Sequence, residues 1–171
     1  LGLTATAQQD VTIKPGDVVL AILDTVVDPG STVTFEPGYY LITRRADGSD
    51  PYDLLRPPPE TTIRGAGSGF DPATATILDC GYTMDSAIKI DDGLDGITVE
   101  DLTITRTIDA LIEVDAGSFD TTINNVWAVK AMDSCLFNDG GDIALNNCVL
   151  GWSSADVVFC DDVTVPSTTV M

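Results

Sequence analysis

Short runs of alternating apolar and polar residues dominate the chain, and Asp, Gly, Asn and Pro separate them. Runs such as 88–90, 97–99, 102–104 and 157–159 are rich in Ile, Val and Thr, which favour strands. The residues between the runs are typical of turns. No segment shows the periodicity of a helix over a useful length, so the pattern predicts an all-β protein.

These runs repeat along the second half of the chain. Segment 85–91 recurs at 109–115 and 133–139, each time 24 residues later, and we expect a fourth copy at 154–160 after 21 residues. In that copy Val157 and Phe159 are expected to point inward, as Leu136 and Asn138 do one copy earlier. A second run repeats in phase, at 97–104, 121–128 and 143–150. Each period therefore holds three short strands, with a bend at a polar pair between the second and the third.

Three strands per period of about 22–24 residues predict a right-handed parallel β-helix, in which each coil buries its inner face against its neighbours. About four coils are recognisable. We expect residues 1–24 to form an N-terminal strand or cap and residues 25–171 to form the solenoid, with a polar, proline-rich excursion at about 44–60. The glycine-rich segment 65–69 is expected to be a turn, because Pro72 prevents the helix that nucleotide binding needs.

Equivalent residues of successive coils lie about 4.7–4.9 Å apart and form ladders. The polar pair at the bend contains asparagines in two successive copies, which predicts two amide ladders, Asn124 over Asn146 and Asn125 over Asn147. Such ladders can satisfy themselves, because an amide both donates and accepts hydrogen bonds.

The sequence at this point resembles the pectin-lyase-like superfamily of right-handed β-helix proteins. The resemblance covers most of residues 25–163 and depends on PGSTVTFEPGYYLI (29–42), TTIRGAGSG (61–69), ATILDCG (75–81), GITVEDLTIT (96–105) and NNCVL (146–150). It implies the fold but no single activity, since the superfamily includes polysaccharide lyases and hydrolases, tailspikes, adhesins and non-catalytic surface proteins.

The charged residues of the chain exclude several classes of function. Its 27 acidic residues, 23 of them Asp, outweigh 8 basic ones and give a net charge of −19, which excludes nucleic acid as a partner. There is no His, which removes Ser-His-Asp catalysis and His-ligated zinc. No apolar run approaches the length of a membrane span.

Aspartates recur at the turns of the predicted coils, where stacked carboxylates would repel one another. Counterions or Ca²⁺, which prefers hard oxygen ligands, could offset the repulsion. The candidate calcium or counterion ligands are Asp91, Asp92, Asp115, Asp139, Asp142 and Asp161. A second column, Asp85, Asp109 and Asp133, is expected to cap the start of a strand.

The candidate sugar contacts are Trp127 and Trp152, because aromatic rings stack on sugars. Trp127 is expected to point outward, since Val126 and Ala128 point inward. For a lyase of this superfamily, the resemblance implies an acidic calcium site beside a basic residue. Arg106 and Lys130 are in equivalent positions, but a basic pair near acids is more often a surface ion pair. No residue is therefore predicted to be catalytic.

The four cysteines leave two alternatives open. Cys80, Cys135, Cys148 and Cys160 form no CxxC motif, so they are either two disulfides of unknown pairing or small core residues. Residues 1–10 resemble the end of a signal peptide, which favours an exported protein, or form a terminal strand that pairs with a neighbour.

The sequence favours a non-catalytic, exported or cell-surface structural protein that self-assembles into a filament or surface layer. Its expected partners are copies of itself, with a polysaccharide as a further candidate. The alternatives are a carbohydrate-binding adhesin and a calcium-dependent polysaccharide lyase.

Overall fold

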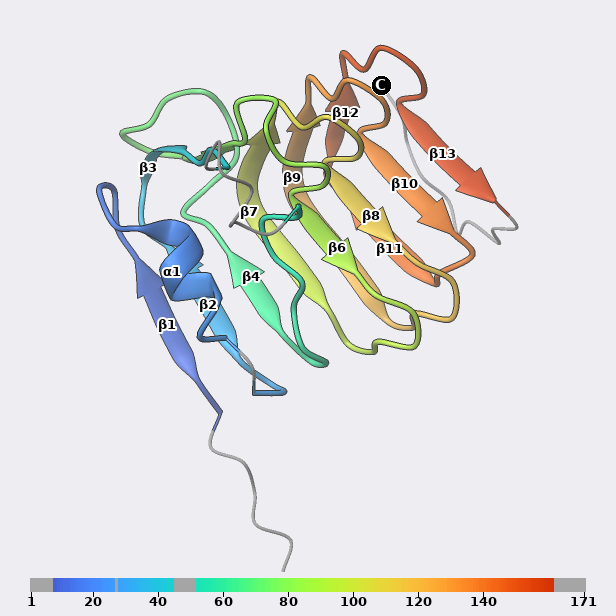
Figure 1. Ribbon diagram of the computed structural model, residues 1–171, viewed down its shortest axis with the longest axis horizontal. Helices are drawn as coiled ribbons and strands as arrows, with labels where there is room; N and C mark the ends of the chain where they lie inside the picture. Colours follow the sequence, from blue (N-terminus) through green and yellow to red (C-terminus); the bar gives the residue numbers. More distant parts are fainter. Residues whose placement is uncertain (1–7, 27, 45–51, 162–171) are drawn as a thin grey trace, which may run out of the picture.

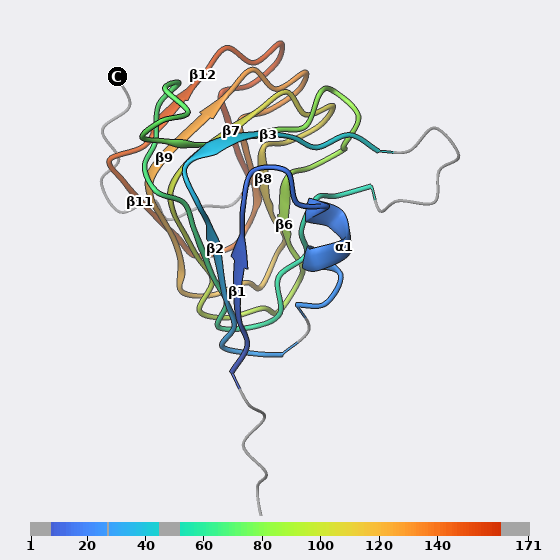
Figure 2. The ribbon, with the colours of Figure 1, turned by 90° about the vertical axis from the view of Figure 1, so that its left-hand side faces the viewer.

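A computed structural model describes residues 8–26, 28–44 and 52–161 (Figure 1). Within these residues the strands pair in parallel and stack as a β-solenoid, which confirms the predicted all-β fold. The strands lie side by side along the long axis in Figure 1, and the view along that axis in Figure 2 shows the successive coils one behind another. The N-terminal segment 1–7, considered above as a pairing strand, lies outside the described residues.

The first face of the solenoid carries one strand from every described coil, in the order β1-β2-β4-β7-β9-β11. These strands are β1 (Asp10–Ile13), β2 (Thr32–Phe35), β4 (Thr62–Arg64), β7 (Thr98–Thr105), β9 (Thr121–Val129) and β11 (Ile143–Asn146). β7 and β9 are long because each bends and continues onto the second face. The bends fall at Asp101 and Asn125, which have φ of 56° and 52°, and so confirm the expected corner at the polar pair.

The second face consists of β3 (Gly38–Leu41), β5 (Thr76–Asp79), the last residues of β7 and β9, and β12 (Val149–Gly151). The third face consists of β6 (Ile88–Ile90), β8 (Ile112–Val114), β10 (Leu136–Asp139) and β13 (Val158–Asp161). A bridge from Leu55 to Ile88 extends this face toward the N-terminus. Part of the expected excursion therefore belongs to the solenoid, and Leu54 and Leu55 are buried.

The solenoid has about six coils rather than the four that the repeat predicts. The extra coils are the N-terminal ones, which share the strand register but not the sequence period. Thr62 of β4 pairs with Thr98 of β7, 36 residues later, whereas Thr98 pairs with Thr122 after 24 residues. Long insertions between the strands hide these coils from a search for a fixed period.

The register of the last coil differs from the prediction by one residue. Leu136 pairs with Val158 and Phe137 with Phe159, so Val158 takes the inward position expected of Val157. The expectation that Phe159 points inward is wrong: its ring stacks on that of Phe137, with centroids 4.9 Å apart and planes 5° apart. The outward stack favours a spacing of 22 residues over the 21 suggested by the sequence.

The core is a column of aliphatic side chains from all three faces. Ile63, Val99 and Ile123 stack on the first face, and Ile88, Ile112 and Leu136 on the third. Each contributes about 1.5–3 kcal/mol on burial. The five-residue helix α1 (Val19–Leu23) buries Val19 and Leu23 at the N-terminal end of this column (Figure 2). No described helix has the length and apolar character to cross a membrane.

Candidate functional site

The outer side of the second face presents two columns of side chains. One column contains two aromatic residues, Tyr39 and Trp127. In order along the solenoid, its residues are Tyr39, Ile77, Thr103, Trp127 and Val149. The neighbouring column contains Leu41, Asp79, Thr105, Val129 and Gly151. Asp79 is 4% exposed and Thr105 6% exposed, which is low for polar residues on the outside of a sheet. Neighbouring groups cover parts of this face: Arg106 and Tyr39 contact Asp79, and a loop lies over Thr103.

The loop between β4 and β5 covers Thr103 and part of Trp127. The chain leaves the sheet at Gly65, where a Cβ would lie 2.2 Å from the carbonyl oxygen of Asp101, so only glycine fits. The loop is fastened to the face at Gly69, whose N–H donates to Thr103 Oγ1 at 2.8 Å while that hydroxyl donates back to the Gly69 carbonyl. This places the ring of Phe70 edge-on against Trp127, with centroids 5.4 Å apart.

Three equivalent residues at the ends of successive strands form the opposite rim. Arg106, Lys130 and Trp152 follow β7, β9 and β12, and all three have left-handed backbones with φ of 63°, 68° and 61°. Such backbones are uncommon outside glycine and cost roughly 1–2 kcal/mol each. The Lys130 ammonium lies 5.9 Å from the ring centroid of Phe70 on the loop and 6.0 Å from that of Trp152 on the rim.

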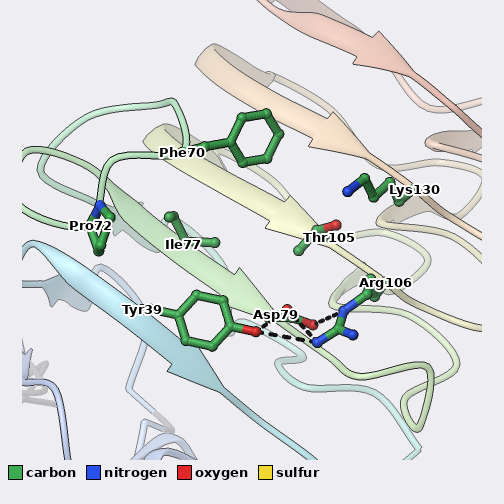
Figure 3. A pocket seen from close by; sticks show the side chains of 8 residues that line it. All are labelled: Tyr39, Phe70, Pro72, Ile77, Asp79, Thr105, Arg106 and Lys130. Atoms are coloured by element: carbon green, nitrogen blue, oxygen red, sulfur yellow. Dashed lines mark hydrogen bonds and ion pairs between the residues drawn. The ribbon is translucent and has the colours of Figure 1, made fainter.

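Loop, face and rim enclose a cavity of about 450 Å³ (Figure 3). Its lining residues are Tyr39, Phe70, Pro72, Ile77, Asp79, Thr105, Arg106 and Lys130. Arg106 donates from Nε and Nη2 to the two carboxylate oxygens of Asp79, each at 2.6 Å. The Tyr39 hydroxyl also donates to Asp79 and accepts from Arg106 Nη2 at 3.2 Å. The Asp79–Arg106 pair thus forms one wall of the cavity without a net charge.

The pKa values of these groups follow from their contacts. Burial would raise the pKa of Asp79, but hydrogen bonds from Arg106, Tyr39 and the Gly81 N–H outweigh it and hold this pKa below its usual value. The hydrogen bond to Asp79 raises the pKa of Tyr39, and the same carboxylate raises the pKa of Arg106. Asp79 is therefore an anion and Arg106 a cation across the physiological range.

Neither predicted sugar contact lines the cavity, but each lies against a residue that does, Trp127 against Phe70 and Trp152 near Lys130. Trp127 is half-buried beneath Phe70, and Trp152 is 66% exposed at the end of the rim. The ammonium of Lys130 and the ring of Phe70 connect them. The sequence did not single out Phe70, Asp79 or Thr105. Their roles depend on a loop that folds back over another coil, and no local pattern encodes that contact.

The predicted aspartate ladder has the expected register, since Asp139 pairs with Asp161 and the Asp115 N–H donates to the Ile90 carbonyl, beside Asp91. Asp91 is bound by Arg56 at 2.7 Å and Asp115 by Lys89 at 3.3 Å. Among the described residues, no three acidic or cysteine side chains come together as metal ligands. The ladder therefore carries basic partners at two of its positions.

One of the two predicted amide ladders is hydrogen-bonded. Asn147 donates to Asn125 at 3.1 Å, and Asn125 donates to Asp101 at 2.7 Å. Asn124 and Asn146 are paired in register, but no hydrogen bond joins their side chains. Asn125 Oδ1 also accepts from Ser68 at 3.1 Å, so this ladder holds the loop that carries Phe70.

Cys80, Cys135 and Cys148 are free thiols. Cys80 and Cys135 are buried, and burial raises the pKa of Cys80 to about 12. These two cysteines thus act as small core residues. The side chain of Cys160 lies outside the described part of the chain.

Comparisons with known proteins find no family model, no curated protein and no solved structure that matches this chain. The likeness to pectin-lyase-like proteins is therefore shown only as a parallel β-solenoid.

Proposed function

We propose that this protein is a non-catalytic, exported carbohydrate-binding protein of pectin-lyase-like architecture that binds a glycan chain at the cavity on its second face. The supporting observation is the combination of aromatic rings and hydrogen-bonding groups around one open space. Phe70, Trp152 and Tyr39 are 48%, 66% and 48% exposed, so their rings are accessible. Sugar rings stack on such surfaces while their hydroxyls bind nearby polar groups, as in ligand sites in general.

The rim supports a ligand that extends over more than one coil. Arg106, Lys130 and Trp152 occupy three successive coils, about 4.7–4.9 Å apart. A linear glycan along the axis of the solenoid would therefore meet a new rim residue at each coil. The left-handed backbone at all three positions places them at the same corner of successive coils.

Binding is favoured over lyase chemistry by the state of the Arg106 guanidinium. Its two donors to Asp79 and its raised pKa keep it protonated, so it cannot remove a proton from a sugar. The carboxylate that holds it is nearly buried and is already fully engaged.

Tryptophan fluorescence tests the proposal directly, because each of the two tryptophans of the chain lies near a residue that lines the cavity. A printed array of neutral and acidic oligosaccharides identifies ligands, and titration of those ligands in solution should change the emission. Phe70→Ala should weaken binding. Phe119→Ala is the matched control, because Phe119 is similarly exposed, at 57%, and does not line the cavity. Absence of binding to every member of the array, by a folded protein, would overturn the proposal.

Self-assembly is a second candidate function. Within the described residues, β1 pairs only with β2 and so presents a free strand edge at the N-terminal end of the stack. Free edges of parallel sheets are templates for pairing with another chain. Replacing Thr12 of β1 with proline should then reduce assembly, measured by electron microscopy and light scattering. Filaments or layers that persist in this variant would count against pairing through β1.

A further inference from the structure

We infer that the bound glycan carries an isolated anionic substituent, a carboxylate or a sulfate among neutral sugars, and that Lys130 and Thr105 bind it. This inference rests on the proposed function and specifies the ligand of the same cavity. It depends on one cation without an acidic partner, one buried hydroxyl without a hydrogen bond, and the charge around them.

Lys130 differs from five other basic residues in the described part of the chain. Lys14, Arg56, Arg64, Lys89 and Arg106 each form an ion pair with an acidic side chain. Lys130 forms none with any described residue, although the chain has 27 acidic residues. Its ammonium instead lies between the rings of Phe70 and Trp152, which attract a cation without neutralising it. The cavity is therefore lined by an uncompensated positive charge.

Thr105 supplies the second group. It lies on the cavity lining between Asp79, its neighbour in register on β5, and Val129, which precedes Lys130 on β9 (Figure 3). Its Oγ1 is buried and has no hydrogen-bond partner. A buried hydroxyl without a partner costs free energy. Because Oγ1 is not accessible from the cavity as it stands, the Thr105 side chain turns toward the cavity when a ligand oxygen provides the partner. A carboxylate or sulfate can accept from both this hydroxyl and the nearby ammonium.

The charge balance limits the ligand to one anionic group at the site. Asp79 already neutralises Arg106, which leaves Lys130 as the only unpaired cation in the described lining. The rest of the chain has a large negative excess, with a net charge of −19. Each further anion would therefore meet repulsion, of about 1 kcal/mol per close pair in water. A densely charged polyuronate fits this surface less well than a mostly neutral glycan.

Two disaccharides, lactose and lactose 3′-sulfate, and two trisaccharides, sialyllactose and trigalacturonate, separate the possibilities in a fluorescence titration. We expect the singly charged probes to bind about ten- to a hundredfold more tightly than lactose, as charge-assisted hydrogen bonds imply. The carboxylate and sulfate probes show which substituent is preferred. Trigalacturonate should bind less tightly than the better singly charged probe. Equal affinity for lactose and the charged probes, or tightest binding of trigalacturonate, overturns the inference and leaves the proposed function intact.

Two variants connect this selectivity to the named residues. Lys130→Gln should reduce the affinity for the singly charged probe by about tenfold or more, and should reduce the affinity for lactose by a clearly smaller factor. Lys14→Gln is its control, because Lys14 pairs with Glu36 and neither residue lines the cavity. Selectivity that survives in Lys130→Gln would contradict the inference.

Thr105→Val removes the unpartnered hydroxyl with little change of shape. It should leave the melting temperature of the free protein unchanged or raised, because no hydrogen bond is lost, yet it should weaken binding of the charged probe. Thr107→Val is the matched control: its Oγ1 is also buried and unpartnered, but Thr107 does not line the cavity. Equal affinities of the two variants for the charged probe would exclude Thr105 as a ligand contact.

Discussion

The ammonium of Lys130 lies 6.0 Å from the ring centroid of Trp152, the equivalent residue of the next coil. Both residues have left-handed backbones, with φ of 68° and 61°. The solenoid thus repeats an unfavourable conformation at the same corner of successive coils. It presents a cation in one coil and an aromatic ring in the next, on the rim of the same cavity.

The backbone at Lys130 leads to a prediction that the glycine variant is more stable than the alanine variant, the reverse of the usual order. In a strand, glycine is less stable than alanine by about 0.5–1 kcal/mol. At a left-handed residue, alanine carries the steric cost and glycine does not. Lys130→Gly should therefore be more stable than Lys130→Ala by about 1 kcal/mol in urea denaturation. Both variants lose the ammonium equally, so the comparison isolates the backbone, and a more stable alanine variant would contradict it.

A second prediction concerns the amide ladder. Asn125 takes part in hydrogen bonds with Asp101, Asn147 and Ser68, and its φ is 52°. Asn125→Ala should lower the free energy of unfolding by about 2 kcal/mol, because these bonds are lost and alanine tolerates this backbone poorly. The variant should also weaken glycan binding, because Ser68 belongs to the loop that positions Phe70.

Asn146→Ala is the matched control for the ladder. Asn146 is exposed and paired in register with Asn124, but its side chain has no hydrogen bond to that residue. Its replacement should change the free energy of unfolding by less than about 0.5 kcal/mol. Similar losses in the two variants would show that the hydrogen-bonded ladder has no special role.

The difference between what the sequence predicted and what it missed lies in the range of the contacts. The regular coils were predictable, because Val99, Ile123 and their neighbours recur at a fixed period. The N-terminal coils were not, because insertions change the spacing between strands such as β4 and β7 while the pairing remains. The register of Phe159 was missed because a stacked aromatic pair outweighs a one-residue difference in spacing. The cavity requires Phe70 to fold back on Trp127, which alternation along a strand does not encode.

A third prediction follows from the column Asp85, Asp109 and Asp133. Burial, then repulsion from Glu113 and Asp133, raises the pKa of Asp109. A raised pKa in the folded state means that this group stabilises the protein when protonated, and that the contribution is lost as pH rises through the folded pKa. Asp109→Asn should therefore raise the melting temperature at pH 7, with a gain that diminishes toward pH 3.5.

The control for Asp109 is Asp156→Asn, which removes the same charge from an exposed site. It accounts for the general benefit of lowering the net charge of −19. A gain in melting temperature that is no greater for Asp109→Asn than for Asp156→Asn would mean that the column contributes no specific repulsion.

The last prediction concerns Asp79, whose side chain is 5% exposed and accepts hydrogen bonds from Arg106, Tyr39 and Gly81. Its lowered pKa means that the carboxylate stabilises the fold above the unfolded-state pKa, and that this stability is lost as pH falls through the folded value. Asp79→Asn should cost about 1.5–3 kcal/mol at pH 7, measured by urea denaturation, and the deficit should shrink at pH 3 and below. Glu100→Gln, which breaks the more exposed pair with Arg64, should cost less than about 1 kcal/mol.

Asp79→Asn also leaves Arg106 without its carboxylate. The folded Asp79→Asn protein should therefore bind trigalacturonate more tightly than the native protein does. A deficit that is independent of pH, or unchanged affinity for trigalacturonate, would show that Asp79 does not set the charge of the cavity.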